Sequence, residues 1–125
     1  MRHAYAHDAV VVLDPGGDPR APGAAITVAL CGHWEHPPPC PLAPHHTATR
    51  RRGDVVRLRV LFAAEPAAEA EVRARIEAAL SGARLDGGAR LDGPDGLTTR
   101  WRLRNARPGT VRTTEAAHAE RLIRS

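Results

Sequence analysis

Lysine and glutamine are missing from this 125-residue chain, and aromatic residues are scarce, with one Phe, one Tyr and two Trp. All eighteen basic residues are therefore arginine, in a composition rich in Ala, Gly, Pro and Arg that is typical of GC-rich coding. The formal net charge of +4 favours an anionic partner, although codon bias accounts for much of the arginine. The shortage of aromatics argues against a surface that stacks nucleic-acid bases.

Long apolar runs are also missing. No stretch approaches the roughly 20 residues that span a bilayer, and charges and histidines interrupt the first residues, where a signal peptide needs an apolar run. We therefore expect a cytoplasmic protein without a membrane partner. Because that compartment keeps thiols reduced, the two cysteines are expected to bind metal or to be buried rather than to form a disulfide. The length suits a single domain over residues 1–125.

Apolar periodicity predicts four strands and two helices in the order β-β-β-α-β-α. Two short β-branched runs, separated by residues that favour turns, are expected to form a hairpin. Two longer runs alternate apolar with basic residues, which is typical of strands with one exposed face. The expected strands are Val10–Leu13, Ile26–Leu30, Val55–Phe62 and Thr99–Arg104, and the expected helices are Pro66–Leu80 and residues 113–124.

These elements indicate an α+β fold, because each strand and helix has one apolar side that must be buried. We expect a single antiparallel or mixed sheet with both helices packed on one face. The nearest common architecture is a ferredoxin-like sandwich or a variant of it. Trp101 and Phe62 have the alternation of the core, so both are expected to face inward.

The segment 31–54 has neither helical nor strand periodicity, and a loop of this length in a compact domain is usually functional or disordered. It contains both cysteines and four of the seven histidines. Thiolates and imidazoles are the ligands that zinc prefers, and four of them can close a tetrahedron. The predicted metal site is Cys31, His33, His36 and Cys40, with His45 and His46 as alternative ligands.

Zinc is the expected metal, although the same ligands also suit copper or iron. The spacing Cys-x-His-x2-His-x3-Cys is not that of a zinc finger or zinc ribbon, so a buried thiol in a solvated loop remains the competing interpretation. A catalytic ion would need an open coordination position and a base, for which Glu35 is the carboxylate within the cluster.

Arginines alternate with apolar residues in the last two expected strands, so that a shared sheet would have one basic face. The predicted anion-binding residues are Arg57, Arg59, Arg100, Arg102 and Arg104. Nucleic acid is one candidate partner for this face, with phosphate attraction as the main contribution. A plain solvated face, or a face for an acidic protein, is the alternative.

Three functional hypotheses follow. The first is a small metal-binding accessory or regulatory protein, in which the ion orders the Cys/His loop for a protein partner. The second is a binding module for anions or nucleic acid that acts through the arginine face, and the third is a small metal-dependent enzyme. A homodimer is compatible with each of them.

Overall fold

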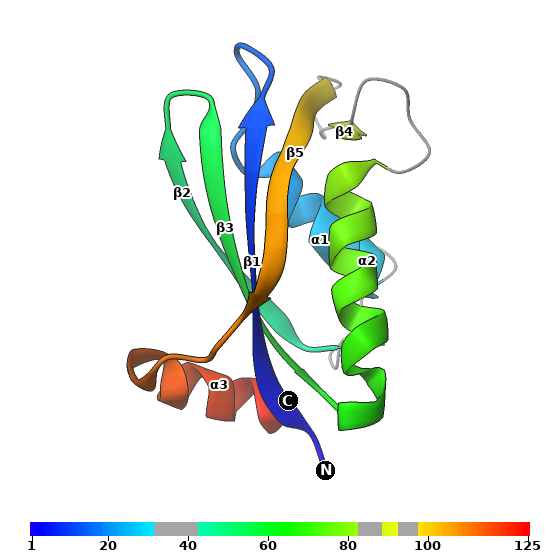
Figure 1. The fold of residues 1–125 in the computed structure, drawn as a ribbon, viewed down its shortest axis with the longest axis vertical. Helices are drawn as coiled ribbons and strands as arrows, with labels where there is room; N and C mark the ends of the chain where they lie inside the picture. The colour runs from blue at the N-terminus through cyan, green and yellow to red at the C-terminus, as the bar shows by residue number, and fades with distance from the viewer. Residues whose placement is uncertain (32–42, 83–88, 93–97) are drawn as a thin grey trace.

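The protein is described by a computed structural model over residues 1–31, 43–82, 89–92 and 98–125. Five strands form one sheet in the spatial order β2-β3-β1-β5-β4, and every neighbouring pair is antiparallel (Figure 1). The strands are β1 (His3–Leu13), β2 (His45–Arg52), β3 (Val55–Ala64), β4 (Ala89–Asp92) and β5 (Thr98–Gly109). This confirms the predicted α+β class with a single antiparallel sheet.

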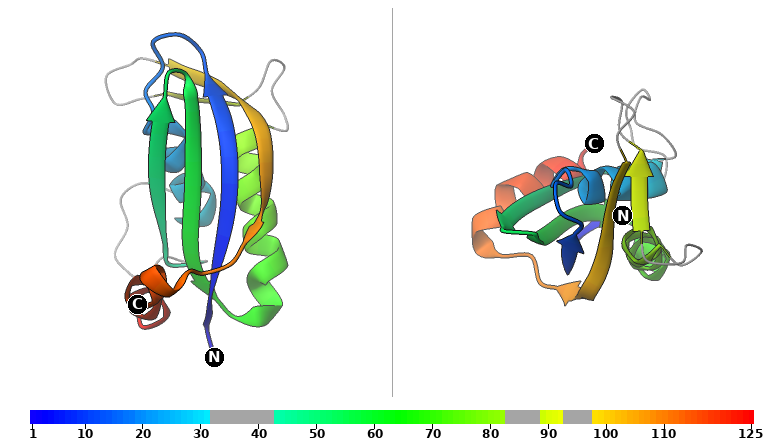
Figure 2. Two further views of the ribbon diagram at one scale, coloured as in Figure 1. Left: turned by 60° about the vertical axis from the view of Figure 1, so that its left-hand side comes forward. Right: turned by 90° about the horizontal axis from the view of Figure 1, so that it is seen from above.

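The helices are α1 (Ala21–Cys31), α2 (Glu69–Ser81) and α3 (Ala116–Ile123), with short 3-10 turns η1 (Pro66–Ala68) and η2 (Thr113–Glu115). None of the described helices is long and apolar enough to cross a membrane. Helices α1 and α2 cover the same face of the sheet, and α3 crosses one end of the opposite face (Figures 1 and 2). The opposite face is therefore only partly covered by the described elements.

The core lies between the sheet and the two helices α1 and α2. Alternate residues of β1 and β3 point into it, and Val72, Ile76 and Leu80 of α2 close it from the other side. Trp101 is fully buried there, and its Nε1 donates a hydrogen bond to the carbonyl of Leu80 at 3.0 Å. The prediction that Trp101 and Phe62 face inward is confirmed.

The predicted strand Ile26–Leu30 is wrong, because these residues lie in α1. The element order is therefore β-α-β-β-α-β-β-α, with three α-helices rather than two. A continuous apolar run is compatible with a buried strand or a buried helix, and periodicity alone does not separate them. Here the run begins with Pro22 in the first turn and continues through ten residues, a length that favours the helix.

The prediction of a loop over residues 31–54 is also wrong in part, because His45–Arg52 forms strand β2. Strand β2 pairs only with β3, so most of its side chains are exposed and it lacks an apolar alternation. The turn to β3 consists of Gly53 and Asp54, and Gly53 has the positive φ of +61° that a tight hairpin requires. This two-residue Gly-Asp step is the sequence signal that could have located β2.

The remaining predicted elements are present. Residues 10–13 belong to a longer β1, residues 55–62 lie in β3, and residues 99–104 lie in β5. The helix expected at 66–80 is η1 followed by α2, and the last predicted helix is η2 followed by α3. The prediction that these two helices share one face is wrong, because α2 packs on one face of the sheet and α3 on the other.

Candidate functional site

Six exposed arginines lie on the sheet face turned away from α1 and α2. The register aligns Arg50 with Arg57 across β2 and β3, Arg52 with Val55 in the next row, and Val12 with Arg102 across β1 and β5. Since side chains alternate along a strand, these residues share one side of the sheet. We call this surface the basic face and define it by the exposed residues Arg50, Arg52, Arg57, Arg100, Arg102 and Arg107.

Three valines lie between the arginines of the basic face. Val10 pairs with Arg57 of β3 and Asn105 of β5, while Val12 pairs with Val55 and Arg102. All three valines are partly exposed, in contrast to the fully buried valines of the core face. The centre of the basic face therefore has a small apolar patch of three valines, with Arg57 beside Val10 on β3 and further arginines on β2 and β5 at the two sides.

The predicted anion-binding residues divide into three groups. Arg57, Arg100 and Arg102 are exposed on the basic face, as their alternation indicated. Arg104 is exposed, but it has no partner in the register of β1. Val10 pairs with Asn105 and Val11 pairs with Leu103, so Arg104 between them is the extra residue of a β-bulge. The bulge changes the alternation of β5, so that Asn105 and Arg107 rather than Arg104 continue the basic face.

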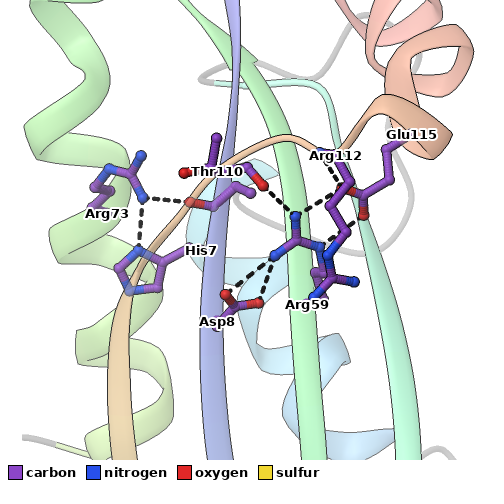
Figure 3. Close-up of polar contacts among 8 residues, drawn as sticks. His7, Asp8, Arg59, Arg73, Thr110, Arg112 and Glu115 are labelled. Carbon is purple, nitrogen blue, oxygen red and sulfur yellow. Dashed lines mark hydrogen bonds and ion pairs between the residues drawn. The ribbon is translucent and has the colours of Figure 1, made fainter.

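Arg59 is not available to a ligand, because its guanidinium is held by two carboxylates and is only 13% exposed. Its Nη1 donates to both oxygens of Asp8, at 2.9 and 3.1 Å. Its Nε and Nη2 each donate to Glu115 at 2.7 Å, and Nη2 also donates to the carbonyl of Thr110 at 2.6 Å (Figure 3). Arg59 therefore joins β1, β3 and the start of α3 instead of projecting into solvent.

Electrostatics within this cluster of Asp8, Arg59 and Glu115 are strong. Hydrogen bonds from Arg59, together with one from the backbone N–H of Arg112 at 2.8 Å, lower the pKa of Glu115 to about 2, against the opposing effect of burial. The same carboxylates raise the pKa of Arg59. Gly109 makes room for the pair, because a Cβ at this position would lie 2.5 Å from Oδ2 of Asp8.

This cluster interrupts the basic face at one end. Among the described residues of β1, β2, β3 and β5, Asp8 is the one carboxylate with the alternation of that face; it forms an ion pair with Arg59 and lies opposite Arg107 in the register of β1 and β5. Within these strands no carboxylate lies opposite Arg50, Arg52, Arg57 or Arg102. Cationic side chains therefore predominate on the part of the face away from Asp8.

Sequence reasoning missed three arginines of this face as ligand candidates, namely Arg50, Arg52 and Arg107. The first two were assigned to a loop, and recognising the Gly53-Asp54 hairpin would have placed them beside Arg57. Arg107 was missed because β5 extends to Gly109, beyond the predicted end at Arg104. No local signal in the sequence indicates the bulge that restores the alternation at Arg107.

The predicted metal ligands are only partly within the described residues. Cys31 is the last residue of α1, and His33, His36 and Cys40 lie outside the described segments. His45 and His46 are neighbours in β2, so their side chains point to opposite sides of the sheet. The two therefore cannot bind one ion from the same side of the sheet, and the prediction that one of them completes the site stays a prediction.

The ring of His45 is already hydrogen-bonded at both nitrogens. Nδ1 lies 3.1 Å from the carbonyl of Ala43 and must donate to it, so Nε2 of the neutral ring accepts from the Thr27 hydroxyl at 3.1 Å. A metal ion at His45 would have to displace Thr27. On the other side of the sheet, His46 contacts His118 of α3, with ring centroids 4.6 Å apart.

Within the described segments, no three His, Cys, Asp or Glu side chains are grouped to hold a metal ion. The described residues thus give the pair His46 and His118, which by itself lacks the third ligand of a usual protein site. Zinc, copper or iron binding by the Cys/His segment stays a prediction. Elemental analysis of untagged protein is the direct check of it.

A second polar cluster lies beneath α2 and serves packing rather than binding. The buried His7 accepts a hydrogen bond at Nδ1 from Arg73 at 3.0 Å (Figure 3). Its Nε2 lies 3.4 Å from Oε2 of Glu77. Arg73 also donates to the carbonyl of Ala6 at 2.7 Å and to Glu69 at 2.8 Å. Because the His7 side chain is 0% exposed, it cannot reach a substrate, and it fixes α2 to β1.

Two histidines with lowered pKa values, His7 and His118, predict that the fold loses stability in acid. Burial lowers the pKa of His7, with Glu77 opposing the shift, and burial together with the neighbouring His46 lowers the pKa of His118. Below about pH 6.5 the unfolded chain binds protons at these histidines that the folded chain does not. Each such proton lowers the free energy of unfolding by up to about 1.4 kcal/mol per pH unit. Glu115 adds a second loss as the pH falls from its ordinary pKa of 4.5 toward about 2.

Urea unfolding across this pH range measures both losses. We expect His7→Gln to reduce the pH dependence of the unfolding free energy between about pH 7 and 5, because it removes one of the shifted groups. The exposed His3 provides the control, and His3→Gln should leave the dependence unchanged. An unaltered pH dependence in His7→Gln would show that His7 does not carry the shift.

Comparisons of the chain with protein-family models, curated proteins and solved structures found no match. The functional argument therefore depends on the residues and their geometry.

Proposed function

We propose that the protein is a binding module for an anionic partner, which it holds through the basic face. One observation carries the proposal: six exposed arginines share a sheet face on which the described strands β1, β2, β3 and β5 have one carboxylate, Asp8, and that carboxylate is ion-paired with Arg59. Arginine is the side chain best suited to this role, because its planar fork binds carboxylate or phosphate with two hydrogen bonds.

Surface arginine alone is weak support, because the composition of the chain is rich in it. The distribution is the stronger argument. Two exposed arginines on or next to the helices have an acidic partner one turn away, Arg75 with Glu71 at 2.9 Å and Arg124 with Glu120 at 3.9 Å. Arg57 has Arg50 and Val10 as its cross-strand neighbours instead. Placing two arginines directly opposite each other costs stability, which favours a role for the pair in binding.

We also infer that the architecture is a variant of the ferredoxin-like sandwich. The segment from β1 through α1, β2, β3 and α2 to β5 has the β-α-β-β-α-β order of that fold, and β1 lies between β3 and β5. In this interpretation β4 and α3 are additions at the edge and at the end of the sheet. The open face is then a regular property of the sandwich, since both of its helices cover the other side.

Heparin binding tests the proposed function. We expect Arg57→Gln/Arg102→Gln to elute from heparin at lower salt than the unchanged protein, and to reduce the slope of log affinity against log salt by about 2. Arg20→Gln/Arg75→Gln removes the same charge from exposed ion pairs outside the basic face and is the matched control. Chelating agents should change neither result, which separates this function from metal binding.

Equal retention of the two double variants would remove the proposal, because net charge rather than the basic face would then determine binding.

A further inference from the structure

We propose that the basic face binds an acidic amphipathic helix of a partner protein, which packs on Val10, Val12 and Val55 and pairs its carboxylates with the arginines on both sides. This inference depends on the proposed function and names the class of its ligand. Three features support it: the valines at the centre of the face, the positions of the arginines around them, and the packing of α3 on the same face.

The apolar centre distinguishes a protein partner from a simple polyanion. A solvated sheet face is usually polar at alternate positions, yet Val10, Val12 and Val55 occupy such positions in two neighbouring rows of the register. Apolar centres with arginine at their edges are typical of protein interfaces, in which arginine is enriched and other charged residues are depleted. A linear polyanion would gain nothing from the valines.

The arginines have the spacing that a helix needs. Arg50 and Arg52 lie on β2, while Arg102 and Arg107 lie on β5, with β3 and β1 between them. Three strand intervals of about 4.8 Å separate these arginines by about 14 Å. A helix with its side chains is about 10–12 Å wide. It therefore fits above the valines with carboxylates in reach of both sides.

Helix α3 provides the precedent within the same chain. It packs on the far end of this face through Leu122, which contacts the apolar cluster of Ala6, Leu61 and Ala63. Its Glu115 end pairs with Arg59 of β3, at 2.7 Å. Helix α3 is thus held on the sheet by an apolar contact and by a glutamate at its N-terminal end that pairs with a sheet arginine, the two kinds of contact that we propose for the partner (Figures 1 and 3).

Two other occupants fit less well. Single-stranded nucleic acid is usually held by exposed aromatic side chains, whereas Trp101 and Phe62 are buried and Tyr5 packs against the core. A second copy of the chain would bring two basic faces together, and like charges in contact disfavour the complex. An acidic helix satisfies the charge and the apolar centre together.

Fluorescence anisotropy with three labelled probes tests the inference. The first is a synthetic peptide of about 18 residues with leucine at helical spacing and glutamate on both flanks. The second is a scrambled peptide of the same composition, and the third is an oligothymidylate of similar charge. We expect the amphipathic peptide to bind at least about tenfold more tightly than either of the others, which is about 1.4 kcal/mol.

The valine contribution is measured with Val10→Thr/Val12→Thr, which keeps the β-branched shape while adding hydroxyl groups. This variant should bind the two peptides equally, with an unchanged affinity for the scrambled one. Val28→Thr, at a partly exposed valine of α1, is the control and should retain the preference. Thermal unfolding of each variant establishes that it is folded.

The outcomes separate the inference from the proposed function. Equal binding of the two peptides by the unchanged protein, or tighter binding of the oligothymidylate, would overturn the helix proposal and leave the anion-binding function standing. Retention of the preference in the double valine variant would overturn it as well. If none of the three probes bound, both proposals would fail.

Discussion

Replacing Arg59 with methionine lowers the expected free energy of unfolding by about 3 kcal/mol, because it leaves two carboxylates without a cation. Asp8 and Glu115 accept four charged hydrogen bonds from this guanidinium and have exposed side-chain fractions of 32% and 19%. Methionine retains the packing of the aliphatic stem but cannot neutralise them. Because Glu115 precedes α3, amide hydrogen exchange in α3 should also become faster.

Neutralising all three residues of the cluster should restore the stability. The triple variant Asp8→Asn/Arg59→Met/Glu115→Gln has no unpaired charge, so it should recover most of the lost stability, as is usual when a whole buried ion network is neutralised. Arg57→Met, at the neighbouring exposed arginine of β3, is the control and should change stability by less than about 0.5 kcal/mol. Urea unfolding at neutral pH measures all three. A loss below about 1 kcal/mol for Arg59→Met would mean that the cluster is a surface ion pair.

Truncation of Trp101 to alanine is expected to cost about 4 kcal/mol, in the range of large-to-small substitutions in tightly packed cores. Trp101 is 0% exposed and joins β5 to the end of α2 through its hydrogen bond to Leu80. Trp101→Phe is the matched variant, since it keeps an aromatic ring and loses the hydrogen bond. Its expected cost is about 2 kcal/mol.

Urea unfolding of the two Trp101 variants separates packing from the hydrogen bond. If alanine and phenylalanine cost the same, the hydrogen bond rather than the ring volume would hold α2 against β5. If both cost less than about 1 kcal/mol, Trp101 would not be part of the cooperative core.

The elements with one apolar side could be predicted from the sequence. Val55–Phe62 and Thr99–Arg104 alternate cleanly because each has one face against α1 and α2 and one face toward solvent. Pro66–Leu80 was recognisable because its apolar residues recur at helical spacing, and Val72, Ile76 and Leu80 are buried as that spacing requires. In these segments local pattern and tertiary environment agree.

The elements without such a pattern could not be predicted. The helix α1 is apolar around most of its circumference, because it packs on both the sheet and α2, so it lacks the period of an amphipathic helix. The strand β2 fails for the opposite reason, since it lies at the edge and exposes most of its residues. An element that is apolar on most sides and an element that is exposed on most sides both lack the spacing of apolar residues from which a helix or strand is predicted.

The candidate site was predictable in its charge but not in its chemistry. Alternation placed Arg57 and Arg102 on one face, while the sequence gives no sign that Arg59 is bound by Asp8 and Glu115, residues far from it along the chain. Val10 and Val12 were expected to pair with Ile26–Leu30, so the sequence did not place them beside Val55 and the arginines of β3 and β5. A face is defined by strand neighbours, and these depend on the whole topology.

Amide chemical-shift mapping during titration with a heparin hexasaccharide tests the central claim most directly, because it locates the bound anion on the sheet. We expect the largest shifts in β2, β3 and the part of β5 around Arg102, with small shifts in α2 and at Arg75. Largest shifts in α2, or shifts spread evenly over exposed arginines, would contradict a binding site on the basic face.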